Sequence, residues 1–515
     1  MGRVMTISTP KHIKIFSRFF TLGALLVALC CSPLHAQMGG GMGGGGMGGG
    51  MGGGGMGGGG MGGGGMGGGG MGGGGMGGGG QGGGGQCGGG APVGGIAIDA
   101  QGVLRTLMVP DPLLAGRRLQ AVSSTHPDLR SPVKLRYIAL SRLENEMVEM
   151  LSAGQSLPDE MVNLVGMTRL QYVFVYPGKG NEKGEIVLAG PAEPWMMDAA
   201  GRTVGAVSGA PTLLLEDLAA ALRGFAPGQP SSHLIGCSID PTQEGLAALQ
   251  KFIQSIGRVN PKGNVISIVR GMQQALGLQT VRVDGISPAT HFAHVLVEAD
   301  YRMKLIGIGL EPPPVRMSTW VQLSSSQSVA ANALQRWYFV PKYERVRVSE
   351  DDLAIELTGQ GVQLVGADEV VLPDGRRMSA DRQSQASKLF TTAFTKKYPE
   401  IAAKSPVYAQ LRSLVDLAVV AAWMQEFDAY GKIGWGATNL RDEGVYPIET
   451  LQPVSQVETA VNAVWRGSRL VTPIGGGVTI QAGMAIDPSN LLMDEKGEVS
   501  KAHAAVDVPA DRWWW

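Results

Sequence analysis

The sequence predicts an α+β fold in which short strands and hairpins mix with helices and are followed by a helical hairpin. Two stretches rich in β-branched and aromatic residues, 95–107 and 172–189, each contain a turn and are typical of β-hairpins. Between them, apolar residues recur every three or four positions, as on one face of a helix. Because strands pair with sequence neighbours and do not alternate strictly with helices, we expect α+β rather than a doubly wound sheet.

The first 36 residues have the composition of an export signal. Four Lys or Arg residues precede an apolar stretch over 19–31 that is short for a membrane span, and Ala36 offers a small residue at the cleavage position. Lipidation at Cys30 or Cys31 is an alternative, although neither follows a small residue. No later run reaches about 18 apolar residues. We therefore expect an exported chain, periplasmic, at the cell surface or secreted, with no transmembrane segment after cleavage.

Residues 37–90 form a tract rich in glycine and methionine. Glycine has the largest backbone entropy to lose and no side chain to bury, so we expect a disordered tether. As a flexible coil, Met38 to Gly90 has an end-to-end distance of roughly 40 Å. Methionine is a soft thioether ligand, so binding of copper as Cu(I) is an alternative role for the tract. The candidate ligands are Met38, Met42, Met47, Met51, Met56, Met61, Met66, Met71 and Met76.

Composition and the spacing of apolar residues divide the chain into five regions. They are a signal peptide over 1–36, the tether over 37–90, an α+β body over 91–380, a helical hairpin over 381–432 and a Gly- and Pro-rich C-terminal region over 433–515.

Helix signals punctuate the first half of the body. Ser141 and Glu144 match a capping box, which predicts a helix that ends near Gly154. Asp240 and Pro241 match the N-cap and first position of another helix. Further helices are predicted over 212–225 and 265–276, and strands over 233–239 and 280–283.

The longest apolar element is a predicted helix over 290–309. Apolar residues at 292, 295, 296, 299, 303 and 306 fall on one helical stripe. Glu298 and Arg302, and likewise Asp300 and Lys304, are acid-then-base pairs four residues apart, which is the favourable orientation on a helix surface. We therefore expect an amphipathic helix whose charged side chains face solvent.

The second half of the chain returns to strands and then becomes helical. Strands are predicted over 319–323, 337–340, 346–348, 354–357 and 362–365, and a later one over 477–481. From Asp381 to Tyr430 the apolar period is helical, and helices over 384–397 and 407–427 predict an αα-hairpin. Asp416 interrupts an apolar run, so it either faces the surface or is a buried acid with a partner. The chain ends in a polar tail with Trp513, Trp514 and Trp515.

Charge and cysteine content limit the partners. The chain has 43 basic and 43 acidic residues, and loss of the four basic residues of the signal leaves 39 against 43. This balance lacks the basic surface that a phosphate backbone requires, so we expect no nucleic acid. Cys87 and Cys237 remain in an oxidising compartment. They either form a disulfide, Cys87–Cys237, or stay unpaired, with Cys237 buried in a strand.

Several segments resemble an exported planctomycete family of unknown function, numbered 1598. The residues that carry the resemblance are Phe292–Glu311 (FAHVLVEADYRMKLIGIGLE), Val93–Asp99 (VGGIAID), Gln171–Val175 (QYVFV), Val187–Glu193 (VLAGPAE) and Gly236–Thr242 (GCSIDPT). The likeness covers roughly 93–430 and leaves the Gly/Met tract outside. It implies an exported protein, and the family supplies no catalytic roles to transfer.

Chemistry-bearing residues gather at the start of the 290–309 helix. His291 and His294, with Glu298, suggest either a one-sided metal patch or solvated and capping histidines. The candidate catalytic residues, with acid/base and anion-anchoring roles, are His294, Asp300, Tyr301, Arg302 and Lys304. The alternative is a salt-bridged helix surface with Tyr301 half buried. No nucleophile elbow, phosphate loop or HExxH motif occurs in the body, and no cofactor is predicted.

The sequence favours an exported, non-enzymatic binding or structural protein of the cell envelope, with an unknown envelope or extracellular protein as partner. One alternative is an extracytoplasmic, hydrolase-like enzyme that uses polar residues around 291–304. A second is soft-metal binding by the methionine tract. The three terminal tryptophans either anchor at a membrane interface, insert in a partner or end an unstructured tail.

Overall fold

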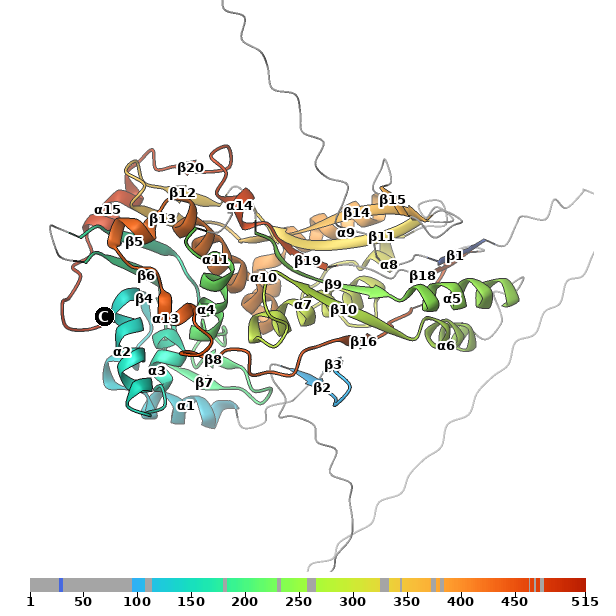
Figure 1. The fold of residues 1–515 in the computed structure, drawn as a ribbon. Coiled ribbons are helices and arrows are strands. Elements are labelled where there is room, and N and C mark those ends of the chain that lie inside the picture. Colours follow the sequence, from blue (N-terminus) through green and yellow to red (C-terminus); the bar gives the residue numbers. More distant parts are fainter. Residues whose placement is uncertain are drawn as a thin grey trace, which may run out of the picture. The chain divides into compact units, whose positions relative to one another are not determined.

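Two β-sheets and a pair of central helices organise the computed structural model, which confirms the predicted α+β class (Figure 1). The structure describes residues 27–30, 95–106, 114–178, 183–228, 233–256, 265–324, 333–342, 345–371, 377–379, 384–462, 464–466, 469–472 and 477–515. All of these residues belong to one compact unit. The tether predicted over 37–90 lies outside the described residues.

The larger sheet has nine strands in the order β15-β14-β11-β19-β9-β10-β16-β3-β2. Neighbours are antiparallel except for the parallel pairs β11/β19 and β16/β3. The strands are β2 (Ile96–Ile98), β3 (Val103–Thr106), β9 (Ile235–Pro241), β10 (Leu278–Asp284), β11 (Ala333–Pro341), β14 (Val362–Val371), β15 (Arg377–Ser379), β16 (Gln456–Glu458) and β19 (Gly477–Ile480).

The second sheet has six strands in the order β20-β12-β13-β5-β6-β4. They are β4 (Val133–Ala139), β5 (Tyr172–Tyr176), β6 (Glu185–Ala192), β12 (Val346–Val348), β13 (Ala354–Leu357) and β20 (Leu492–Met493). Two smaller sheets are β7 (Trp195–Met197) with β8 (Thr203–Gly205), and β1 (Val27–Cys30) with β18 (Arg469–Thr472) and β17 (Val464–Arg466).

The helices surround and connect these sheets. The α-helices are α1 (Leu114–Ser124), α2 (Leu140–Ser152), α3 (Asp159–Val162), α4 (Leu215–Gly224), α5 (Gln243–Ile256), α6 (Val265–Leu276), α7 (His291–Ile308), α8 (Trp320–Leu323), α9 (Gln385–Lys396), α10 (Tyr398–Lys404), α11 (Pro406–Glu426), α12 (Ala429–Ile433), α13 (Thr438–Arg441), α14 (Ala482–Ala485) and α15 (Glu498–Ala504). Two 3₁₀ turns, η1 (Pro127–Leu129) and η2 (Leu164–Gly166), complete the set. The α5–α6 pair joins β9 to β10 and packs on itself beyond the strand ends (Figure 1).

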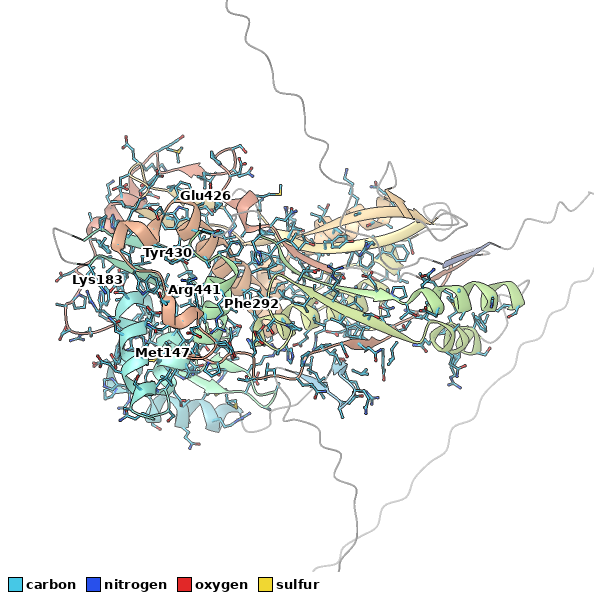
Figure 2. The ribbon with its side chains drawn as sticks, viewed as in Figure 1. Met147, Lys183, Phe292, Glu426, Tyr430 and Arg441 are labelled. Atoms are coloured by element: carbon cyan, nitrogen blue, oxygen red, sulfur yellow. The ribbon has the colours of Figure 1, made fainter. Side chains whose placement is uncertain are left out.

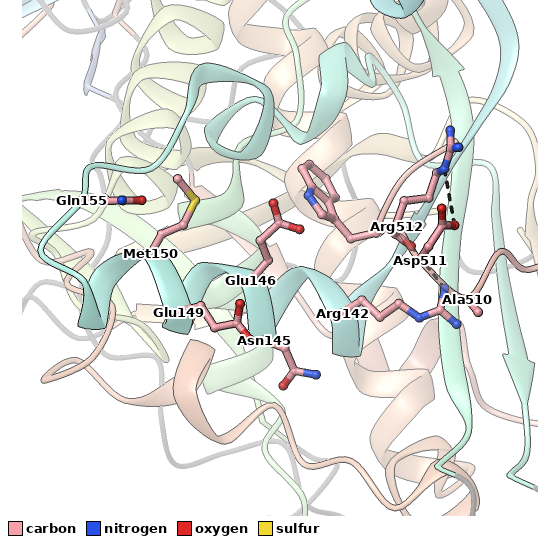
Figure 3. Close-up of a pocket in the computed structure, with 10 residues that line it drawn as sticks. Arg142, Asn145, Glu146, Glu149, Met150, Gln155, Ala510, Asp511 and Arg512 are labelled. Carbon is pink, nitrogen blue, oxygen red and sulfur yellow. Dashed lines mark hydrogen bonds and ion pairs between the residues drawn. The ribbon is translucent and has the colours of Figure 1, made fainter.

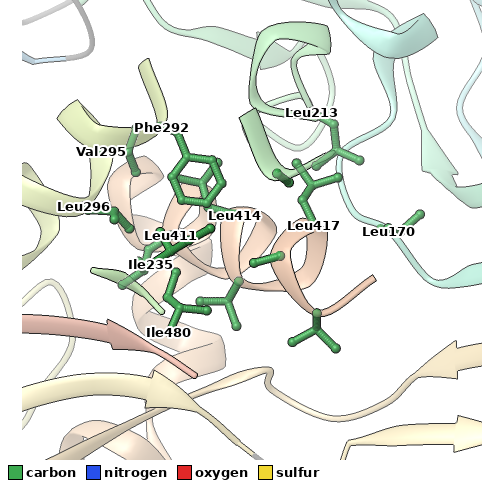
Figure 4. Packing of buried hydrophobic residues seen from close by; sticks show 14 of the residues in the cluster. Leu170, Leu213, Ile235, Phe292, Val295, Leu296, Leu411, Leu414, Leu417 and Ile480 are labelled. Atoms are coloured by element: carbon green, nitrogen blue, oxygen red, sulfur yellow. The ribbon is translucent and has the colours of Figure 1, made fainter. Parts of the chain in front are cut away.

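The main core lies where α7 and α11 meet. Helix α7 contacts β9, β19 and β11 on one side and α11 on the other, while α11 also contacts α4, α10 and α14. Figure 4 shows Phe292 and Leu296 of α7 gathered with Leu411 and Leu414 of α11, and all four are buried. Both helices are thus buried nearly all round, as helices in the interior of a large protein are.

Helix α11 is long and apolar enough to cross a membrane, by length and composition, among the described residues. In the structure 94% of its apolar window is buried inside the protein. Neighbouring elements therefore already cover this surface.

Many predicted elements are confirmed. The 95–107 and 172–189 hairpins form as β2/β3 and β5/β6, and α6, β12 and β13 have the predicted bounds. Thr290 caps α7 through its hydroxyl, which accepts from the Ala293 N–H, and Gly309 ends the helix at φ +76°.

The strand predicted over 319–323 is wrong, because these residues form α8. Thr319 and Gln322 make a complete capping box, in which each side chain accepts a hydrogen bond from the other residue's backbone N–H. The reciprocal caps favour a helical turn over the extended state that β-branched residues suggested.

Two predicted helix starts are also wrong. Helix α2 begins at Leu140 without a side-chain cap, since the Ser141 hydroxyl donates to Glu185 instead. Asp240 and Pro241 remain in β9, and the hydroxyl of Thr242 accepts from the Gly245 N–H at the start of α5. In the first case Glu185 is the tertiary partner of the Ser141 side chain, and in the second Arg336 pairs with Asp240 at 3.5 Å, so neither side chain caps a helix.

Candidate functional site

Helix α7 is the element on which the sequence concentrated its candidate residues. Sixteen of its eighteen residues are buried. Figure 2 shows Phe292 among the side chains in the middle of the body. The expectation of a solvent-facing charged stripe is therefore wrong. The cause is tertiary: α11 covers the face of α7 that the larger sheet leaves open.

His291 begins a chain of buried polar contacts. Its Nδ1 lies 3.0 Å from both carboxylate oxygens of Asp217 on α4, and the ring N–H donates to them. On the other side, Nε2 lies 3.4 Å from the amide nitrogen of Gln410 on α11. That amide nitrogen faces the ring because the Gln410 oxygen accepts a hydrogen bond from Arg202. When the ring is neutral, these contacts place its hydrogen on Nδ1.

Electrostatics around His291 favour proton uptake. Burial lowers the pKa of His291, but the ion pair with Asp217 and the proximity of Glu216 outweigh it, so that the pKa lies above its ordinary value. Burial, together with Asp217, raises the pKa of Glu216 to about 7 against the opposing effect of His291. A protonated ring would place an N–H against the Gln410 amide N–H₂, so proton uptake requires Gln410 to turn.

Arg202 and Glu298 continue the buried network. The Arg202 Nη2 lies 2.7 and 2.6 Å from the two carboxylate oxygens of Glu298. Glu298 also pairs with Arg302 at 3.3 Å, and Arg302 reaches Glu311 at 3.2 Å. Burial raises the pKa of Glu298, and the two guanidinium groups oppose that rise. The predicted Glu298–Arg302 pair is thus confirmed as a contact, but it lies in the interior.

Asp300 and Lys304 form a second buried pair. Their charged atoms are 2.9 Å apart, and the Lys304 ammonium lies 3.5 Å from the Ile239 carbonyl of β9. Burial raises the pKa of Asp300, against the opposing effect of Lys304. Cys237, which is buried on the same strand, has its thiol pKa raised well above the usual range by burial and then by Asp300.

His294 and Tyr301 contact the backbone of the C-terminal region. His294 Nε2 donates to the Gln452 carbonyl at 2.8 Å, and burial lowers the His294 pKa to about 4. The Tyr301 hydroxyl donates to the Glu458 carbonyl at 3.1 Å, and burial raises its pKa to about 12. His291 and His294 are therefore neither solvated nor capping, which corrects that interpretation. The two rings bind different partners, Asp217 and the Gln452 carbonyl.

Two pockets among the described residues lie elsewhere. One, of about 520 Å³, is open and polar and lies between α2 and residues 510–513 (Figure 3). Its walls include Arg142, Glu146 and Glu149 of α2. The other, of about 450 Å³, lies at the N-terminus of α7 and includes Thr290 and Arg223. None of the five candidate catalytic residues lines either pocket.

The methionine candidates and Cys87 lie outside the described residues. Within the part of the chain that the structure describes, no three His, Cys, Asp or Glu side chains are placed to hold a metal ion. Cys237 is buried in β9 and makes no disulfide there. Copper binding and the Cys87–Cys237 disulfide thus stay predictions.

The C-terminal tryptophans dock on the body, so the alternative of an unstructured tail is wrong. The Tyr137 N–H donates to the Trp515 carbonyl at 3.0 Å, the Trp515 N–H returns a bond of 3.2 Å, and the Ala139 N–H donates to Trp513 at 2.8 Å. The tail thereby extends the six-stranded sheet at its edge strand β4. Trp513 is only 5% exposed, and the Trp515 ring stacks on Tyr137 with centroids 5.4 Å apart.

Sequence reasoning missed Arg202, Asp217 and Gln410, which complete the network around α7. Asp217 and Gln410 lie 74 and 119 positions from His291 along the chain, and Arg202 lies 96 positions from Glu298. No local spacing links them. The available signal was indirect, since a histidine and a glutamate in an apolar helix need buried partners.

Helix α7, on which the network is centred, lies in the region that matches a known family, whereas Arg202, Asp217 and Gln410 lie outside that region. Residues 237–320 match the family described as Protein of unknown function (DUF1598). This segment spans β9, α5, α6, β10 and α7 and reaches the start of α8. The likeness expected over 93–430 is thus supported for 237–320, as a domain of unknown function. No curated protein and no solved structure matches the chain.

Proposed function

We propose that this chain is an exported, non-enzymatic binding or structural protein of the planctomycete cell envelope, with a partner among envelope or extracellular proteins. The basic and apolar leader over 1–36 and the following Gly/Met tether support export and display. The near-neutral charge disfavours nucleic acid as a partner.

The observation that carries the proposal is that the ionisable side chains of α7 bind partners inside the protein. Glu298 and Asp300 each have an internal basic partner, while His291, His294 and Tyr301 bind internal acceptors. A catalytic group has to reach a substrate, whereas these groups link α7 to α4, β9 and the C-terminal region. They hold the fold, and the surface that remains for function is the outer one.

The first test concerns export and attachment. We expect the natural host to remove residues 1–36, so that mass spectrometry of the protein finds Gln37 as its N-terminus in the envelope or medium. The mature chain and a variant without Met38–Gly90, each used to capture proteins from envelope fractions, should retain the same partner through the folded body. An intact leader in the cytoplasm, or no saturable partner for either form, would contradict the proposal.

One observation favours an enzyme as the second candidate. Glu216 is half-buried, has a pKa of about 7 and lies beside the Asp217–His291 pair, which is an arrangement that suits acid/base chemistry. A screen with chromogenic esters, phosphates and glycosides distinguishes the two candidates. Activity that Glu216→Gln abolishes while the protein stays folded would establish the enzyme.

Soft-metal binding by the tether remains a separate proposal. Titration of the mature chain with Cu(I) under reducing conditions, beside the variant without Met38–Gly90, tests it. Binding of several ions that disappears with the tract would support a metal role. Equal binding by both forms would exclude the tract.

A further inference from the structure

Three arginines surround a single buried carboxylate on α11. Arg345 is 1% exposed and donates from Nη2 to Asp416 and from Nη1 to the Gly361 carbonyl at 3.0 Å. Arg169 reaches the other oxygen of Asp416 with Nε at 3.8 Å. Arg412 lies one helical turn before Asp416 on α11. The cluster therefore holds three positive charges against one negative charge.

Within the described residues, Asp416 is the one carboxylate that forms ion pairs with these arginines. Burial lowers the pKa of Arg169, Asp416 raises it, and Arg412 and Arg345 lower it further. Among the described residues, Asp416 is the one carboxylate that acts on the pKa of Arg169. Among the described residues Arg412 makes no ion pair or hydrogen bond. Two uncompensated charges in a largely buried cluster are costly unless an anion joins them.

The same arginines leave hydrogen-bond donors unused. The Nε groups of Arg169, Arg345 and Arg412 are buried and have no hydrogen-bond acceptor within the described part of the chain. A guanidinium presents its N–H groups as a planar fork that matches the oxygens of phosphate and sulfate. The unused donors and the excess charge thus call for the same kind of ligand.

The turn between β13 and β14 gives the cluster access to solvent. Gly359 is exposed at φ +67°, and a Cβ atom there would meet nothing within 4 Å. Its carbonyl accepts from Arg169 Nη2 at 2.6 Å, and the Arg169 side chain is 27% exposed. At Gly361, by contrast, a Cβ atom would lie 3.1 Å from Arg345 Nη1 and from Arg412 Cγ, so the Arg345 guanidinium and the aliphatic stem of Arg412 pack against the turn.

We propose that Arg169, Arg345 and Arg412, held at the β13–β14 turn, form a binding site for a tetrahedral oxyanion of charge −2, either phosphate or sulfate. Asp416 orients Arg345 and remains in place, and the ligand contacts Arg169 and Arg412 from the side of the turn. The site lies away from the α7 network, so it does not depend on the function proposed above.

Calorimetric titration of the mature chain with sodium phosphate and with sodium sulfate, at a fixed ionic strength set with sodium chloride, tests the site. We expect saturable binding of one ion, and a higher unfolding midpoint in either anion than in chloride alone. Arg412→Gln keeps the side-chain stem that packs on Gly361 and removes the charge, so we expect binding at least tenfold weaker. Arg270→Gln, a matched loss of charge on the exposed face of α6, should bind as the wild type does.

Stability without ligand distinguishes a binding role from a structural one. If Arg412 awaits an anion, Arg412→Gln should be at least as stable as the wild type in chloride and should gain less from phosphate. Arg169→Gln, at the partly exposed position, gives a second variant if Arg412→Gln does not fold. No binding beyond that of chloride, or equal phosphate affinity in wild type, Arg412→Gln and Arg169→Gln, would overturn the proposal.

Discussion

Removal of the Trp513 side chain should destabilise the protein although only two residues follow it in the sequence. Trp513 is buried in the main core, where its neighbours include the α2 region. Substitution of a buried aromatic residue by alanine costs about 3 to 5 kcal/mol. A terminal segment can leave its site without unfolding the remainder, so the loss is limited to the free energy of docking. We therefore expect Trp513→Ala to lose about 3 kcal/mol.

The matched control is Trp515→Ala at the very end of the chain. The Trp515 ring is half-buried and stacks on Tyr137, an aromatic contact that contributes about 0.5 to 1.5 kcal/mol. Its backbone bonds to Tyr137 do not require the indole. We expect a loss of about 1 kcal/mol, clearly smaller than that of Trp513→Ala.

Urea denaturation followed by far-ultraviolet circular dichroism gives the free energy of unfolding of each variant. Limited proteolysis measures undocking directly, since residues 505–512 should be cut faster in Trp513→Ala than in the wild type. A Trp513→Ala variant within 0.5 kcal/mol of the wild type would refute the reasoning, as would equal losses at the two positions. Either result would mean that the tail does not dock as described.

Two further predictions concern the interior. Burial lowers the pKa of His294 in the folded protein to about 4, from an ordinary value of 6.5. The neutral ring therefore contributes to the free energy of unfolding fully above pH 6.5. This contribution, up to about 3 kcal/mol, is lost as the pH falls through 4. His294→Gln should flatten this loss in urea titrations at pH 7.5, 6 and 5, while exposed His126→Gln should not. Gly307→Ala would bring a methyl group 2.4 Å from the buried Trp337 ring and should cost about 1 to 3 kcal/mol, whereas Gly116→Ala, in open space, should cost less than 0.5 kcal/mol by the same assay.

Local sequence signals predicted the elements that depend on local chemistry. Thr290 and Gly309 bound α7 because a hydroxyl cap and a left-handed glycine act within one turn of the helix. The short strands β12 and β13 followed from their β-branched residues and flanking turns. The α+β class followed from the same local patterns.

The surroundings of each element could not be predicted in this way. The apolar stripe of α7 was real, but the sequence held no information that α11 would cover its other face and bury Glu298 and Asp300 as well. Asp416 illustrates the same limit. The sequence left it either surface-facing or buried with a partner, and the partner, Arg345, lies 71 positions away.

Side-chain partners at a distance also displaced local motifs. Glu144 matched the third position of a capping box, yet its carboxylate accepts from the Trp435 indole and from the backbone N–H groups of Asn439 and Leu440. Three charge-assisted hydrogen bonds outweigh one cap. Several such contacts come from the C-terminal region. Apolar residues show little periodicity there, so these contacts could not be predicted from the sequence.

We propose that the ionisable residues of α7 hold the fold rather than perform catalysis, and a double-mutant cycle on Arg202 and Glu298 tests this proposal most directly. Both side chains are at most 5% exposed. Loss of one partner leaves a buried charge, so Arg202→Met and Glu298→Leu should each cost about 3 to 5 kcal/mol, with Arg202→Met the milder because Arg302 still pairs with Glu298.

The double variant should lose at least 2 kcal/mol less than the sum of the single losses, since it removes both charges together. Urea titrations of the four proteins at pH 7.5 give this coupling energy. Losses below 1 kcal/mol that simply add would contradict the claim. So would a measurable catalytic activity that disappears in Glu298→Leu while its free energy of unfolding is unchanged.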